Sequence, residues 1–102
     1  MNYQHGDVLI RGITSLPDGL TKLGENDVVV AEGEQTGHHH RVQGQVALYE
    51  RPNKTMVMEV KHMPAFIFHE EHKPIEIIPG VYEIGRVQEY DYFEEMARQV
   101  QD

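Results

Sequence analysis

The chain has 102 residues, of which 39% are hydrophobic and 25% are charged. This length and composition predict a single folded domain over residues 1–102 and argue against both a disordered chain and two domains. The formal net charge is -8, from 17 acidic residues against 9 Lys and Arg. Affinity for a phosphate backbone comes largely from basic side chains, so we expect no nucleic-acid partner.

The chain contains no cysteine, which excludes disulfides, thiolate metal ligands and cysteine nucleophiles. No apolar run approaches the roughly 20 residues that are needed to span a bilayer. Residues 1–7 lack the basic and apolar regions of a secretory signal, so a cytoplasmic protein without membrane association is expected. A domain of this size buries a modest core, and a bound metal or a homo-oligomer would add stability.

Short β-type runs follow one another along the chain, and turn residues separate them. Turns are expected at 17–19, which reads Pro-Asp-Gly, and at 51–54, which would join two strands as a hairpin. Gly85 is expected to mark a bulge or bend in the last strand. The predicted strands are 7–11, 27–31, 45–50, 55–61, 65–69, 75–78 and 81–90.

One helix is predicted, at about 91–100. Asp91 followed by Glu94 resembles a capping pair. The apolar residues that follow recur at helical spacing and would form one stripe: Phe93, Met96, Ala97 and Val100. The predicted fold is therefore mainly β, a small antiparallel barrel or sandwich with a short C-terminal helix that closes one end.

Six of the seven histidines fall between positions 38 and 72. In an extended segment alternate residues share a face, so His38 and His40 would point the same way and His39 the other way. His69 and His72 can converge if the chain turns at Glu70-Glu71. His5 and His62 are interpreted as incidental.

These two pairs predict one metal site with four imidazole ligands: His38, His40, His69 and His72. Neutral imidazole suits divalent transition metals, and zinc is favoured over nickel, iron or copper. Nearby groups that could orient the rings are Glu34, Thr36, Glu70 and Glu71. The alternative is that the histidines are unconnected surface or core residues.

Two family resemblances follow from these motifs. The His-x-His after a Gly-rich turn resembles cupins, but residues 41–44 stand where cupins carry a glutamate. Nearly the whole chain is similar to small uncharacterised bacterial and phage-type β-rich proteins that carry Gly-Glu-x-Thr-Gly-His-x-His and His-x-x-His-x-Pro-Ile. Here these motifs are residues 33–40 and 69–75, and the final Gln-x-Glu-Tyr-like motif is less complete at 88–90. The resemblance implies that the histidine motifs belong together, and it implies no reaction.

Three functions are compatible with this sequence. Four histidines would fill a tetrahedral shell, as in structural or binding metal sites. Three ligands plus water would instead suit a small metal-dependent enzyme of hydrolase or oxygenase type, with Glu34, Glu70 or Glu71 as general base. The third is a phage or bacterial assembly protein without metal, in which the histidines respond to protonation and Phe66, Phe68 or Tyr92 is exposed.

Overall fold

The structure is a computed structural model that describes residues 1–32 and 37–86. Within these residues the chain forms strands and no helix. The strands in chain order are β1 (Asn2–His5), β2 (Val8–Ile13), β3 (Thr21–Glu32), β4 (His39–Glu50), β5 (Met56–Val60), β6 (Ala65–His69), β7 (His72–Ile77) and β8 (Gly80–Arg86). None of the described residues forms a helix long and apolar enough to cross a membrane.

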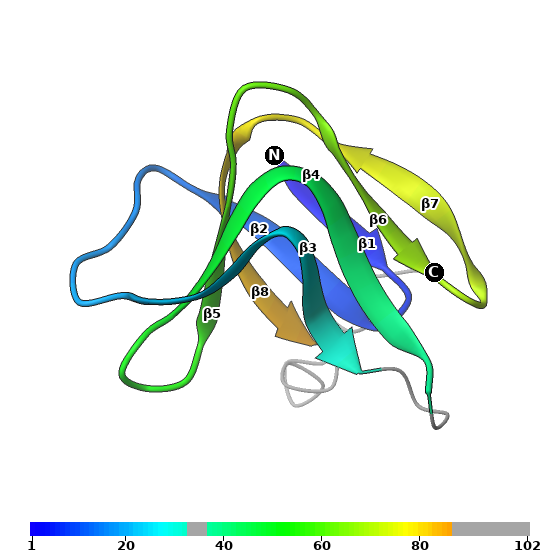
Figure 1. The fold of residues 1–102 in the computed structure, drawn as a ribbon, viewed down its shortest axis with the longest axis horizontal. Coiled ribbons are helices and arrows are strands. Elements are labelled where there is room, and N and C mark those ends of the chain that lie inside the picture. The colour runs from blue at the N-terminus through cyan, green and yellow to red at the C-terminus, as the bar shows by residue number, and fades with distance from the viewer. Residues whose placement is uncertain (33–36, 87–102) are drawn as a thin grey trace, which may run out of the picture.

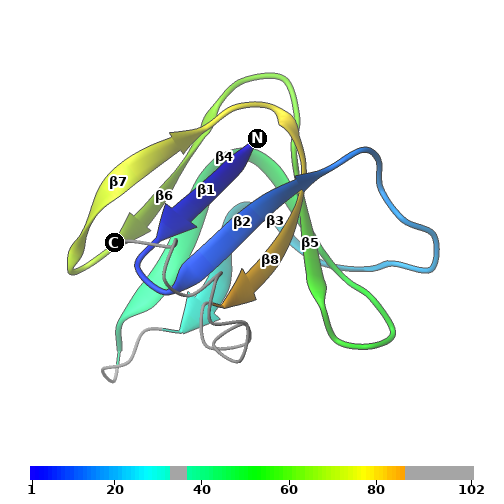
Figure 2. The same ribbon diagram turned by 180° about the vertical axis from the view of Figure 1, so that it is seen from behind.

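Seven strands make a nearly closed antiparallel barrel in the order β1-β2-β8-β5-β4-β6-β7, and β3 pairs with β4 outside this path. The strands curve around a common interior in both views (Figures 1 and 2). β4 links the two sides of the barrel because its two halves pair with different strands. Residues 41–43 pair with β6, and residues 46–50 pair with β5. The sequence left open the choice between barrel and sandwich, and the described strands form a barrel.

β1 and β7 meet at the seam of the barrel, where side chains make the bonds between them. Nε2 of His5 on β1 donates to the carbonyl oxygen of Lys73 on β7 at 2.8 Å. Beyond the end of β7, the Ile78 N–H donates to the hydroxyl oxygen of Tyr3 at 3.1 Å. A histidine at the end of β1 is therefore part of how the barrel closes.

The interior is filled mainly by aliphatic side chains from β2 to β8. Alternating residues of β2 and β5 point inward, as the period of a half-buried strand requires. The buried cluster comprises Val8, Ile10, Val28, Val30, Val42, Val46, Leu48, Met58, Val60, Ala65, Ile67, Ile77, Tyr82 and Ile84. Histidines replace these aliphatic residues at one end of the interior, where His5 and His40 are the buried polar side chains.

Several element predictions need correction. β1 was not predicted, and β3 and β4 are each 12 residues long where shorter strands were expected. Gly85 faces Leu9 in regular register, so the expected bulge is absent from the described part of β8. The predicted helix at 91–100 lies outside the described residues.

Candidate metal centre

Strand register brings three histidines into one row. His69 and His72 face each other at the end of the β6–β7 hairpin, across the two-residue turn Glu70-Glu71. In the β4–β6 ladder Arg41 faces Phe68, so His40 lies beside His69, and their ring centroids are 4.2 Å apart. The His-x-x-His motif therefore corresponds to a tight hairpin whose two histidines share the inner face of the barrel.

His38 and His39 diverge at the start of β4. The ring of His38 turns toward His69, with centroids 5.6 Å apart. His39 points to the other face, where its Nε2 lies 3.0 Å from a carboxylate oxygen of Glu32. The alternation expected for the triple-histidine run is present.

His5 joins this cluster, although the sequence pattern led us to interpret it as incidental. Its side chain is buried, and its ring centroid lies 5.2 Å from that of His40 and 5.5 Å from that of His72. The sequence did contain a signal for the position of His5. Gly6-Asp7 is a glycine-containing two-residue segment between β-type residues, and such a segment indicates a hairpin turn. Recognising that hairpin would have placed His5 at a strand end.

Hydrogen bonds fix the tautomers of His5 and His40. The Lys73 carbonyl only accepts, so His5 carries its proton on Nε2 and presents a lone pair at Nδ1. Nδ1 of His40, 3.1 Å away, must donate to it. The neutral ring of His40 therefore has an unprotonated Nε2, which lies 3.7 Å from Oδ1 of Asp7.

Burial keeps both of these rings neutral. It lowers the pKa of His40 to about 4, and the neighbouring His69 and His5 act in the same direction. Burial also lowers the pKa of His5, against the opposing effect of its bond to the Lys73 carbonyl. An uncharged imidazole is the form that binds metals.

Among the described residues, one group has the geometry to hold a metal ion: His38, His69 and Glu70. One ligand atom from each lies within 4.8 Å of the other two. Nδ1 of His38 and Nε2 of His69 are buried and have no hydrogen-bond partner. Nδ1 of His38 lies 3.2 Å from Oε2 of Glu71, an ion-pair distance without hydrogen-bond geometry. Buried polar atoms without partners are rare in folded proteins, and coordination of an ion is one way in which such atoms are satisfied.

This group differs from the predicted set of four histidines. His40 and His72 are adjacent to it but outside it, and Glu70, expected only to orient a ring, is a member. One reason is that the free lone pair of His40 is at Nε2, which lies 3.7 Å from Oδ1 of Asp7. Another is that His72 packs on the backbone of Gly6, where an added Cβ would lie 2.6 Å from Nε2 of His72.

Glu70 is held as a carboxylate. Its own backbone N–H is the main cause that lowers its pKa, followed by the backbone N–H of His39 and the charges of His38 and His69. The bond from the His39 N–H to Oε1 measures 3.1 Å and ties the β6–β7 turn to the start of β4. Glu34 and Thr36, the other expected orienting groups, lie outside the described residues.

His69 carries a further constraint. The Glu71 N–H donates to Nδ1 of His69 at 3.0 Å, so the neutral ring holds its proton on Nε2. A metal at Nε2 needs that lone pair, so the proton must move to Nδ1 and the bond from Glu71 must break. Metal binding at this atom would therefore change the β6–β7 turn.

Of three comparisons with known proteins, one finds a match, and that match covers nearly all of the barrel. No curated protein and no solved structure matches the chain. One family model matches residues 4–87, which include both histidine motifs and nearly all of the described barrel. The chain therefore belongs to the family described as Domain of unknown function (DUF8820).

Proposed function

We propose that this small β-barrel is a metal-binding domain, and that His38, His69 and Glu70 hold a divalent transition metal at the end of the barrel. The observation that carries the proposal is a pair of buried imidazole nitrogens without hydrogen-bond partners, on His38 just before β4 and on His69 at the end of β6, with the Glu70 carboxylate beside them. Without an ion, each of these nitrogens has lost its contact with water and gained no hydrogen bond, at a cost of about 1–3 kcal/mol. A cation would satisfy both once the proton of His69 has moved from Nε2 to Nδ1.

Zinc is the metal that this donor set fits best. Two imidazoles and one carboxylate are common zinc ligands, at roughly 2.0–2.2 Å from the ion. A tetrahedral ion would place its ligand atoms about 3.3 Å apart, whereas the three groups lie within 4.8 Å of one another. Nε2 of His69 and Oε1 of Glu70 are 4.0 Å apart, so binding would draw these two side chains closer together. The same three donors also suit iron(II).

The ligand set is tested by titrating zinc into single variants at constant pH and ionic strength. His38→Ala, His69→Ala and Glu70→Gln should each weaken binding by more than the roughly 10–100-fold that loss of an orienting partner costs. His39→Ala is the matched control, because the His39 side chain points away while its backbone N–H still holds Glu70. It should bind like the parent.

His40 and His72 decide between this ligand set and the four-histidine set that the sequence predicts. If the two rings only support the site, His40→Asn and His72→Asn should weaken zinc binding no more than an orienting partner does. If the two variants lose zinc as fully as His69→Ala, and Glu70→Gln keeps it, four histidines form the shell. A parent protein that binds no zinc would overturn the proposal.

A small metal-dependent hydrolase is the second candidate, and the number of ligands favours it. Three protein ligands leave one position for water, as in catalytic zinc sites. Glu71, whose Oε2 lies 3.2 Å from Nδ1 of His38, is the nearest candidate base. Zinc-dependent hydrolysis of a simple aryl ester that Glu71→Gln abolishes without loss of zinc would support this function. Equal rates in parent and variant would exclude Glu71 as the base.

A further inference from the structure

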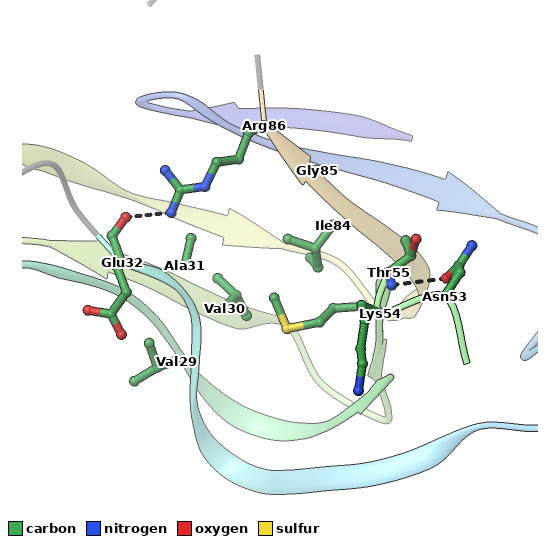
Figure 3. Close-up of a pocket in the computed structure, with 11 residues that line it drawn as sticks. Val29, Val30, Ala31, Glu32, Asn53, Lys54, Thr55, Ile84, Gly85 and Arg86 are labelled. Atoms are coloured by element: carbon green, nitrogen blue, oxygen red, sulfur yellow. Dashed lines mark hydrogen bonds between the residues drawn. The ribbon is translucent and has the colours of Figure 1, made fainter. Parts of the chain in front are cut away.

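The barrel has a groove with a mixed apolar and polar lining at the end where β3 and β8 finish and β5 begins. Its volume is about 520 Å³. Its apolar lining includes Val30, Ala31, Met56 and Ile84, and Figure 3 shows Val30 and Ile84 pointing toward one another. Val30 and Ile84 belong to the core, and Ala31 and Met56 are partly buried against it. The groove is thus an opening onto the hydrophobic core.

The rim of this groove carries Lys54 and the last described residue, Arg86. The side chain of Lys54 is 81% exposed. Arg86 donates to the carbonyl oxygen of Glu32 at 2.6 Å (Figure 3). It also donates to Asp7 at 2.8 Å, and the two bonds fix the end of β8 at the groove. Whatever follows Arg86 in the chain begins at this rim.

Residues 87–102 follow, and their composition fits the groove. Their apolar residues recur at helical spacing and would form one stripe in a helix: Phe93, Met96, Ala97 and Val100. The same segment has five acidic residues and one basic residue, Arg98. Its acidic charge complements Lys54, whose Nζ lies 3.9 Å from Oε1 of Glu50, while the exposed Glu32 of the same groove opposes it. Residues 87–92 span at most about 20 Å when extended, so the tether keeps the stripe close and makes docking effectively intramolecular.

We propose that residues 87–102 of this same chain dock in the groove, with the apolar stripe covering Ala31, Met56 and Ile84. This inference is independent of the proposed metal site. It assigns the groove to a part of the chain that lies almost entirely beyond the family match, which ends at residue 87.

The absence of Trp from the chain makes the test direct. Phe93→Trp places a single indole on the stripe, and Gln99→Trp places one outside it as the matched control. In the full chain, the indole at 93 should emit at shorter wavelength and be quenched several-fold less by acrylamide than the indole at 99. Equal quenching at the two positions would overturn the proposal.

Two groove variants show whether protection at position 93 comes from this groove. Ala31→Glu puts a charge on its floor, and Lys54→Glu reverses the charge on its exposed rim with little risk to folding. Each should increase the quenching of the indole at 93 while circular dichroism still shows a folded barrel. Protection that persists in both variants would place the segment elsewhere. Protection that disappears on dilution would mean docking onto a second copy, and either result would overturn the proposal.

Discussion

At the scale of single residues, His40 explains most about how the cluster behaves. Its ring is buried, donates through Nδ1 to His5 and has neighbours that repel a second charge. An aliphatic residue would fill the same volume without a buried polar group, and clustered histidines are costly to hold away from water. The chain nevertheless places them at the end of the barrel where the unpartnered nitrogens lie.

The first prediction concerns pH and the metal-free protein. The pKa of His40 is about 4 in the folded state against 6.5 in the unfolded chain. Between these two pH values the unfolded chain binds a proton at His40 and the folded chain does not. Stability should be full above about pH 6.5 and should fall between about pH 6.5 and pH 4, by on the order of 2–3 kcal/mol. The lowered pKa of His5 acts in the same direction.

Urea unfolding of the chelated protein at several pH values measures this loss. His40→Asn should flatten the dependence, because the amide can still donate to His5 but does not titrate in this range. His62→Asn, at an exposed position outside the cluster, should leave the dependence as it is. A parent protein whose stability is constant from pH 7 to pH 4.5 would contradict the lowered pKa.

The sequence predicted the orientation of the histidines only where they follow a regular spacing. Alternation separated His39 from His38 and His40, and the spacing of His69 and His72 indicated a turn. Membership of Glu70 could not be predicted in this way, because it depends on how a two-residue turn orients a side chain that is adjacent to a histidine. His5 lies 33 residues before His38 in the sequence, and only closure of the barrel brings it near.

At the scale of elements, the β1–β2 hairpin supports the histidine row from outside the β4–β6–β7 sheet. Gly6 has φ +61°, and a Cβ there would lie 2.6 Å from Nε2 of His72. Glycine at this position therefore allows both the turn and the close approach of His72. A larger residue would displace the His72 ring.

The second prediction follows from that contact. Gly6→Ala should destabilise the fold by about 2–4 kcal/mol, from left-handed strain and the clash with His72. Gly19→Ala is the matched control: its φ is +76° and nothing lies within 4 Å of an added Cβ, so only the backbone cost of about 1–2 kcal/mol applies. Chemical unfolding compares the two variants, and equal losses would show that His72 does not pack on Gly6.

The limits of sequence patterns at this scale are also physical. The 55–61 and 65–69 runs were predicted as strands because their composition agrees with burial, and β5 and β6 lie there. β3 and β4 extend further than the predicted runs because backbone pairing includes polar residues such as Glu25 and Gln43. The prediction of a bulge at Gly85 was wrong because a glycine in a strand also serves simply as a small residue.

At the scale of the whole molecule, the barrel is closed by side chains at one seam and by the histidine cluster at one end. A metal that joins β4 to the β6–β7 turn would add a cross-link at that same end. The barrel itself was among the predicted architectures, but closure depends on how β4 divides its pairing between β5 and β6. No local pattern in the sequence carries that information.

The third prediction is that zinc stabilises the folded chain. At a free zinc concentration about 100 times Kd, stabilisation should reach about 2.7 kcal/mol, a rise in Tm of roughly 10–20 °C for a domain of this size. Glu70→Gln should lose most of this rise while the Tm of the metal-free protein changes little, because Glu70 is exposed. Thermal unfolding with zinc and with a chelator measures both, and an equal rise in the parent and in Glu70→Gln would place zinc elsewhere.

The composition of the metal centre is measured most directly by X-ray absorption spectroscopy of the zinc-loaded chain, prepared without an affinity tag. We predict one zinc per chain, with scattering from two imidazole rings and the remaining positions filled by oxygen from Glu70 and water. Four imidazole rings would contradict the His38, His69 and Glu70 ligand set. Failure to retain stoichiometric zinc would contradict the metal-binding function itself.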